Sequence, residues 1–325
     1  MIFAKLDQPM KFQNSPSARL AGVMALAAAL FATTLPALAA GEEQFDSPEA
    51  AVAALAGAAK AKDTNAVRAI FGPEGHELVS PDVVQASEGF TRFAQRIAEK
   101  TALVKVSDTN EILEIGADGW PFPMPLVKQG EKWFFDVEAG REEILNRRIG
   151  ADELGAIDVC RAYVDAQREY ASRDRDGDGI LEYAQFILST PGKRDGLYWP
   201  AKNPGDEVSP LGPLIAQAHQ EGYHRRTGLL TKDQTPYHGY YFQLLIRQGK
   251  HAPGGKYDYI INGHMIGGFA LVAWPAEWGN TGIMTFIVNQ QGKVYQKNLG
   301  PKTGKLAKKI TAYDPDDAWM PVEGK

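Results

Sequence analysis

The chain contains a single cysteine, Cys160, so no disulfide can form within it. The fold must therefore be held together by burial of apolar side chains. The 325 residues are 44% hydrophobic, enough for a sizeable core, and a chain of this length usually forms two domains. Cys160 lies in an amphipathic helical pattern, which predicts a buried, unreactive thiol, because free cysteine packs as a small hydrophobic side chain.

The first forty residues have the pattern of a secretory signal peptide. Lys5, Lys11 and Arg19 precede an apolar run at 20–35, and residues 37–39 read Ala-Leu-Ala, a small-residue cleavage site. The alternative is an uncleaved anchor, but a membrane-spanning helix needs ~20 apolar residues and this run is shorter. We therefore expect residues 1–40 to be a cleaved signal peptide and the mature protein to be periplasmic or secreted, with no membrane span.

The charge balance argues against several classes of partner. Loss of residues 1–40 removes Lys5, Lys11, Arg19 and Asp7, which changes the formal net charge from −5 to −7. A chain this acidic is not expected to bind nucleic acid or an anionic membrane as its main partner.

Residues 41–150 predict a small α+β domain. Ser47-Pro48-Glu49 is a helix start, a second helix begins after Asp63-Thr64, and Phe90, Phe93 and Ile97 mark a third. Strand patterns follow at 103–106, 112–115, 125–127 and 132–135. Helices followed by a curved antiparallel sheet resemble, in element order, the cystatin-like cone of the nuclear-transport-factor-two superfamily.

Residues 151–325 predict a second α+β domain. A helix is expected to break at Gly150 and to restart with Asp152 as its cap, followed by an irregular stretch to about residue 234 with a short helix at 213–222. Strand patterns then occur at 240–246, 257–261, 268–274, 285–288 and 294–296.

One long helix before an antiparallel sheet resembles the globular head of type IV pilin-like and pseudopilin proteins. The residues that carry this resemblance are 161–163, Gln167 and Tyr170 on the helix, 239–242 in the first strand, and Pro275, Gly279, 281–282 and 285–288 in the last hairpin. Pilins begin with a hydrophobic assembly helix, whereas this helix is amphipathic and follows another domain. The difference argues against incorporation into a filament.

Nearly all of residues 44–322 resemble an exported bacterial family catalogued as domain of unknown function twenty-nine-fifty. The matching segments are 120–123 (WPFP), 143–150 (EILNRRIG), 160–163 (CRAY), 174–185 (DRDGDGILEYAQ), 190–200 (TPGKRDGLYWP), 236–241 (PYHGYY) and 267–288. The resemblance implies no activity, because none is assigned to the family.

The segment 174–185 has the register of an EF-hand calcium loop. Asp174, Asp176 and Asp178 occupy positions 1, 3 and 5, and glycine stands at position 6. Position 12 is Gln185 in place of the bidentate glutamate, which should weaken binding, and Glu182 at position 9 can contribute. The sequence thus predicts a structural Ca²⁺ site. The alternative is a solvated Asp/Gly turn whose carboxylates are neutralised by nearby arginines.

A second candidate group is rich in aromatic side chains and histidine. Its members are Tyr198, Trp199, Tyr237, His238, His264, Trp274 and Trp278. One interpretation is a pocket in which rings stack on a sugar or peptide and histidine supplies a proton. The alternative is ordinary packing in the core and hairpins.

No reaction motif occurs in the sequence: there is no nucleophile elbow, phosphate-binding glycine loop or paired metal-binding histidine motif. We therefore expect a non-enzymatic envelope protein that binds or scaffolds an envelope protein or polymer. The alternative is a hydrolase of a cell-wall or sugar polymer that uses the His/aromatic group. A third hypothesis is a small apolar ligand in a pocket of the first domain.

Overall fold

Three helices begin the fold. The computed structural model describes residues 41–77, 79–175, 177–201, 203, 205–221, 223 and 236–323. The helices are α2 (Pro48–Ala61), α3 (Thr64–Glu77) and α4 (Val83–Glu99). Ser47 caps α2 by accepting a hydrogen bond from the Ala50 N–H, and α3 starts at the predicted break. The three predicted helices are confirmed.

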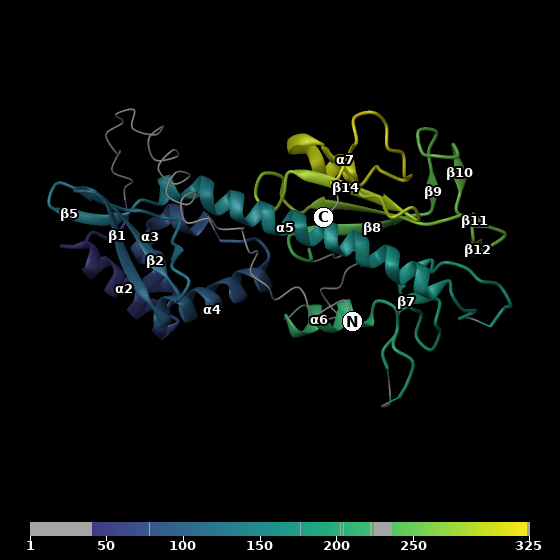
Figure 1. Ribbon diagram of the computed structural model, residues 1–325, viewed down its shortest axis with the longest axis horizontal. Helices are drawn as coiled ribbons and strands as arrows, with labels where there is room; N and C mark the ends of the chain where they lie inside the picture. Colours follow the sequence, from purple (N-terminus) through teal and green to yellow (C-terminus); the bar gives the residue numbers. More distant parts are fainter. Residues whose placement is uncertain are drawn as a thin grey trace. The chain divides into compact units, whose positions relative to one another are not determined.

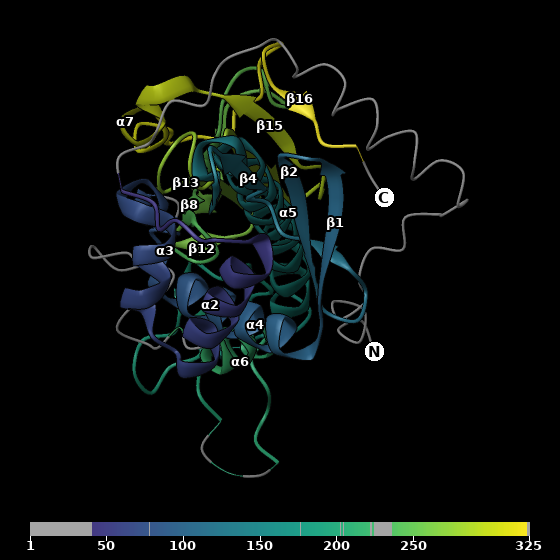
Figure 2. The same cartoon turned by 90° about the vertical axis from the view of Figure 1, so that its left-hand side faces the viewer.

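An antiparallel sheet packs against these helices. Its strands are β1 (Thr101–Ser107), β2 (Asn110–Ile115), β3 (Trp120–Pro121), β4 (Leu126–Gln129) and β5 (Lys132–Phe135). They pair in the order β1-β2-β4-β5, with β3 also on β2. Helix α2 contacts β1 and β5, and α4 contacts β2; Figure 2 looks onto this group of helices and strands.

One helix of 34 residues, α5 (Val137–Tyr170), follows the sheet without interruption (Figure 1). The predicted break at Gly150 and the predicted cap at Asp152 are therefore wrong. A glycine inside a helix costs about 1 kcal/mol relative to alanine. Packing on both sides outweighs that cost, because Ile144 packs on one apolar cluster and Ile157 is buried in another. Asp152 lies within α5, and it is buried.

The C-terminal part is built on a second antiparallel sheet. Its strands pair in the order β16-β15-β14-β13-β8, and α5 contacts β13 and β14. The sheet strands are β8 (Tyr240–Leu245), β13 (Ala270–Pro275), β14 (Met284–Asn289), β15 (Tyr295–Asn298) and β16 (Met320–Pro321). Strands β13 and β14 are buried along most of their length, so this sheet carries the centre of the larger core.

Shorter elements surround this sheet. They are β6 (Phe186–Leu188), β7 (Gly196–Tyr198), α6 (Gly212–Gln220), β9 (Arg247–Gln248), β10 (Tyr257–Asp258), β11 (Ile260–Ile261), β12 (His264–Met265), η3 (Gly300–Lys302) and α7 (Thr303–Ala307). Strands β6 and β7 form a parallel pair inside the stretch predicted to be irregular, and β11 and β12 form a short hairpin.

The mixed α+β class is confirmed, and the buried apolar residues form two clusters. One gathers the helices and sheet that precede α5, and the other gathers the second half of α5 with the second sheet. Cys160 is buried in the second cluster, as predicted. The domain boundary at residue 150 falls inside α5 and stays a prediction. Among the helices that the structure describes, none is long and apolar enough to cross a membrane. The predicted signal peptide lies outside the described residues.

Candidate functional site

The acidic loop after α5 is shaped by one aspartate. Asp174 accepts hydrogen bonds from the backbone N–H groups of Gly177 (2.7 Å) and Gly179 (2.9 Å). Both glycines have left-handed backbones, with φ of 83° and 88°, which residues with a Cβ rarely adopt. The turn at Gly179 occurs where the calcium-loop register places it. Asp176, the second predicted ligand, lies outside the described residues.

The carboxylates of the loop meet a histidine from the β11–β12 hairpin. His264 Nδ1 lies 3.2 Å from Asp178 Oδ2 and 3.6 Å from Glu182 Oε2. These three side chains each offer one ligand atom, and the three atoms lie within 4.8 Å of one another. The structure thus joins two predicted calcium ligands to a residue predicted for a different site. Asp174 does not belong to this group of three.

The same loop is fixed to the hairpin by hydrogen bonds. The Tyr183 N–H donates to the Met265 carbonyl (2.9 Å), and the Met265 N–H donates to Glu182 Oε2 (2.8 Å). Gln185 Nε2 donates to the Gly263 carbonyl at 2.6 Å. The residue at position 12 of the calcium register therefore ties the loop to the hairpin.

The arginines near the loop pair with another acid. Arg173 and Arg194 lie 3.4 and 2.8 Å from the Glu207 carboxylate, and Arg175 also pairs with it. The side chain of Arg175 is only 3% exposed, with its guanidinium 5.5 Å from the Trp199 ring centroid. These arginines therefore neutralise Glu207, a role that sequence reasoning did not foresee.

The predicted His/aromatic group is divided among several environments. Tyr237 and His238 are in ring contact, with centroids 4.3 Å apart. The other members have different surroundings: Tyr198 ends β7, Trp199 faces arginines, His264 joins the acidic loop, Trp274 packs on Tyr241, and Trp278 donates to Asn298. The pair Tyr237–His238 adjoins a further polar cluster.

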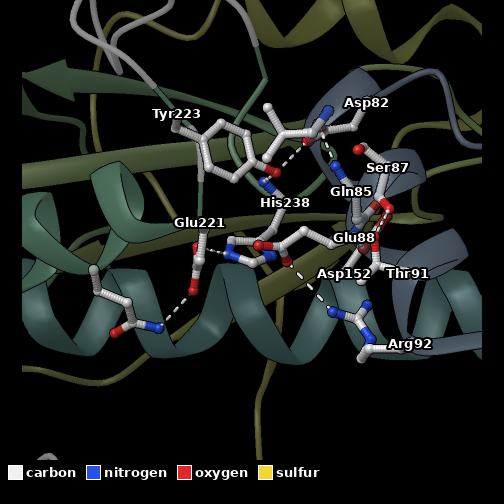
Figure 3. Close-up of polar contacts among 12 residues, drawn as sticks. Asp82, Gln85, Ser87, Glu88, Thr91, Arg92, Asp152, Glu221, Tyr223 and His238 are labelled. Carbon is white, nitrogen blue, oxygen red and sulfur yellow. Dashed lines mark hydrogen bonds and ion pairs between the residues drawn. The ribbon is translucent and has the colours of Figure 1, made fainter. Parts of the chain in front are cut away.

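That polar cluster was missed by sequence reasoning. It joins α4, the middle of α5, the end of α6 and the turn before β8 (Figure 3). Asp82 caps α4 through Oδ1, which accepts from the backbone N–H of Val84 and Gln85. Its Oδ2 accepts from the Tyr223 hydroxyl at 2.6 Å and from the Gly239 N–H at 3.4 Å. One buried carboxylate thus accepts hydrogen bonds from the start of α4 and from two residues that follow α5 in the sequence, Tyr223 and Gly239.

A second buried carboxylate, Asp152, is poorly satisfied. Its Oδ1 accepts from Gln85 Nε2 at 2.5 Å, but its buried Oδ2 has no hydrogen-bond partner. A Cβ at Gly239 would lie 2.5 Å from that Oδ2, so the glycine backbone covers it closely. Burial raises the pKa of Asp152 to about 7, although Gln85, His238 and Arg148 act in the opposite direction.

His238 occupies the centre of the cluster (Figure 3). Its φ of 46° is left-handed, which is uncommon for a residue with a side chain. Nε2 lies 2.9 Å from Glu221 Oε2, and Gln217 Nε2 donates to Glu221 Oε1 at 2.8 Å. Burial raises the pKa of Glu221, but hydrogen bonds from His238 and Gln217 outweigh it, so the net shift is downward.

The structure defines a mixed α+β protein with an acidic loop closed by a histidine and a partly buried acid–histidine cluster. The chain belongs to the family described as "Protein of unknown function (DUF2950)", whose model matches residues 42–322. No curated protein and no solved structure matches the chain.

Proposed function

We propose that this is an exported protein of the cell envelope that binds or scaffolds an envelope protein or polymer without catalysing a reaction. The signal-peptide pattern supports export. The order of helices and strands before α5 supports a cystatin-like first domain, and the packing of α5 on β13 and β14 supports a pilin-like second domain. In this proposal, a cation at the acidic loop holds the second domain in its binding form, and the loop register favours Ca²⁺.

The convergence of Asp178, Glu182 and His264 carries the cation proposal. The three residues come from two segments about 80 positions apart, yet their ligand atoms lie within 4.8 Å of one another. Two carboxylates this close repel each other unless a positive charge lies between or beside them. A bound divalent cation removes that repulsion and links the loop to the hairpin.

The test is the melting temperature of the purified protein with millimolar Ca²⁺ and with chelator. A ligand that binds only the folded state stabilises by RT ln(1 + [L]/Kd), about 2.7 kcal/mol at a hundredfold excess over Kd. We expect a rise with Ca²⁺ that Asp178→Asn abolishes. The matched control is Asp165→Asn, an acid on α5 that is 74% exposed and pairs with Arg168. Identical melting in Ca²⁺ and in chelator would refute a calcium site.

A second candidate function is hydrolysis of a cell-wall or sugar polymer. The specific observation in its favour is Asp152, which lies beside the His238–Glu221 pair. Its pKa is raised to about 7, and a carboxyl group with such a pKa suits proton transfer at neutral pH. Release of soluble fragments from purified cell-wall polymer, lost in His238→Asn, would support it. Asparagine tolerates the left-handed backbone at this position, and His251→Asn is the control. No release by the wild-type protein would refute it.

A further inference from the structure

The ligand atoms at the acidic loop differ from those of an oxygen-only calcium site. Calcium prefers carboxylate and carbonyl oxygens, six to eight in number. Here an imidazole nitrogen of His264 faces two carboxylates, and imidazole favours zinc and neighbouring transition metals. The inference below rests on the cation site of the proposed function and names the class of metal that it takes.

The His264 nitrogen supplies an observation independent of the acids. Nδ1 is buried, and it makes no hydrogen bond even though Asp178 Oδ2 is only 3.2 Å away, because the contact lacks hydrogen-bond geometry. A buried nitrogen that makes no hydrogen bond is costly. Coordination of a metal by this nitrogen would satisfy it, with the proton of the neutral ring on Nε2.

The spacing of the ligand atoms agrees with tetrahedral coordination. Zinc binds nitrogen and oxygen at 2.0–2.2 Å, so neighbouring ligand atoms around a tetrahedral ion lie roughly 3.4 Å apart. The nitrogen of His264 is 3.2 Å from one carboxylate oxygen and 3.6 Å from the other. Two of the three distances between ligand atoms are therefore close to the tetrahedral value, and the third, between the two carboxylate oxygens, is at most 4.8 Å.

Backbone hydrogen bonds hold both carboxylates in place. Ile180 N–H donates to Asp178 Oδ1 at 2.8 Å, which leaves Oδ2 directed at the histidine. Met265 N–H, from the residue after His264, donates to Glu182 Oε2. Outer contacts of this kind orient metal ligands and strengthen binding. The loop and the hairpin thus position the ligand atoms through their own backbones.

We propose that Asp178, Glu182 and His264 form a site for Zn²⁺ or a similar transition metal, which binds there more tightly than Ca²⁺. Three protein ligands leave a fourth position for water or for a donor group of a partner. His264 is the residue that determines the choice of metal, since Asp178 and Glu182 alone would suit either ion.

The experiment uses the untagged protein in its exported form, freed of metal. This protein is titrated with Zn²⁺ and, in a separate experiment, with Ca²⁺. Heat of binding and melting temperature are both recorded. We expect one Zn²⁺ per chain, bound at least tenfold more tightly than Ca²⁺. His264→Ala should weaken Zn²⁺ binding at least tenfold and leave Ca²⁺ binding unchanged, whereas Asp178→Asn should weaken both. The control is His251→Ala, because His251 also pairs with an aspartate, Asp314, at 3.1 Å.

The visible absorption of bound Co²⁺ tests whether His264 is a metal ligand. If His264 had a purely structural role, its replacement would not change this absorption. We expect Co²⁺ to give the strong visible absorption of a tetrahedral site in the wild-type protein and in His251→Ala, and to lose it in His264→Ala. Equal loss in both histidine variants would show adventitious binding and overturn the inference.

The outcomes separate this inference from the proposed calcium site. One outcome overturns the inference and leaves the calcium proposal standing: Ca²⁺ stabilises the protein, His264→Ala does not change that stabilisation, and Zn²⁺ binds more weakly than Ca²⁺. Tight Zn²⁺ binding that requires His264, without a Ca²⁺ effect, supports the inference and overturns the calcium proposal. If neither ion binds, both proposals fall.

Discussion

Replacement of Asp152 by asparagine should stabilise this protein, and more so at high pH. Asp152 is 1% exposed, and its folded-state pKa is raised from 3.8 to about 7. A shift of about three pKa units corresponds to about 4 kcal/mol, since each unit is worth 1.36 kcal/mol. The ionised form is therefore destabilised in the fold by that amount. Asparagine carries no charge and still offers an oxygen to Gln85.

The sign of the pH dependence follows from proton binding. Between pH 4 and pH 7 the folded state keeps the Asp152 proton while the unfolded chain has lost it, so the wild-type free energy of unfolding falls as pH rises. From pH 5 to pH 8 this group should lower wild-type stability by about 2 to 3 kcal/mol. The asparagine variant lacks this term, so its advantage should increase over the same interval and level off above pH 8.

The assay is urea unfolding of the wild-type protein and Asp152→Asn at pH 5, 6, 7 and 8. The control is Asp82→Asn, because Asp82 accepts hydrogen bonds through both oxygens and caps α4. That variant keeps an oxygen for the cap but loses the acceptor of the Tyr223 hydroxyl, so it should lose about 1–3 kcal/mol. A difference between Asp152→Asn and the wild-type protein that is constant from pH 5 to pH 8 would refute the raised pKa of Asp152.

Three further predictions concern individual contacts. Gly239→Ala should lower the melting temperature, because its Cβ would lie 2.5 Å from Asp152 Oδ2 and φ is 72°; an unchanged melting temperature contradicts the close contact. Tyr223→Phe removes a donor to Asp82 Oδ2 and should cost about 1–3 kcal/mol in urea unfolding, so a neutral result argues against that bond. Cys160 is buried, and burial raises the pKa of its thiol to about 12. A thiol reagent should therefore label it only after unfolding, and rapid labelling of the native protein counts against this packing.

Most helices and sheet strands were predictable because their signals are local, whereas the two-residue strands β3 and β16 and the short helix α7 were not predicted. Ser47 caps α2 with a hydrogen bond to a residue three positions away. Gly179 has the left-handed backbone that the local calcium-loop register predicts at its position 6. Local signals failed at α5, where Gly150 and Asp152 indicate a break. Apolar packing on both sides of these residues outweighs the weak local preference of each.

The candidate sites depend on contacts between distant residues, which no local pattern encodes. From the sequence alone, the α+β class, the unreactive position of Cys160, the acidic loop and His238 as a candidate were determined. Only the tertiary structure brings His264 to Asp178, and only it places Gln85 against Asp152 across 67 positions. The physical reason is that the chemistry of a polar atom depends on the groups within a few ångströms of it. The folding of the whole chain decides which groups those are.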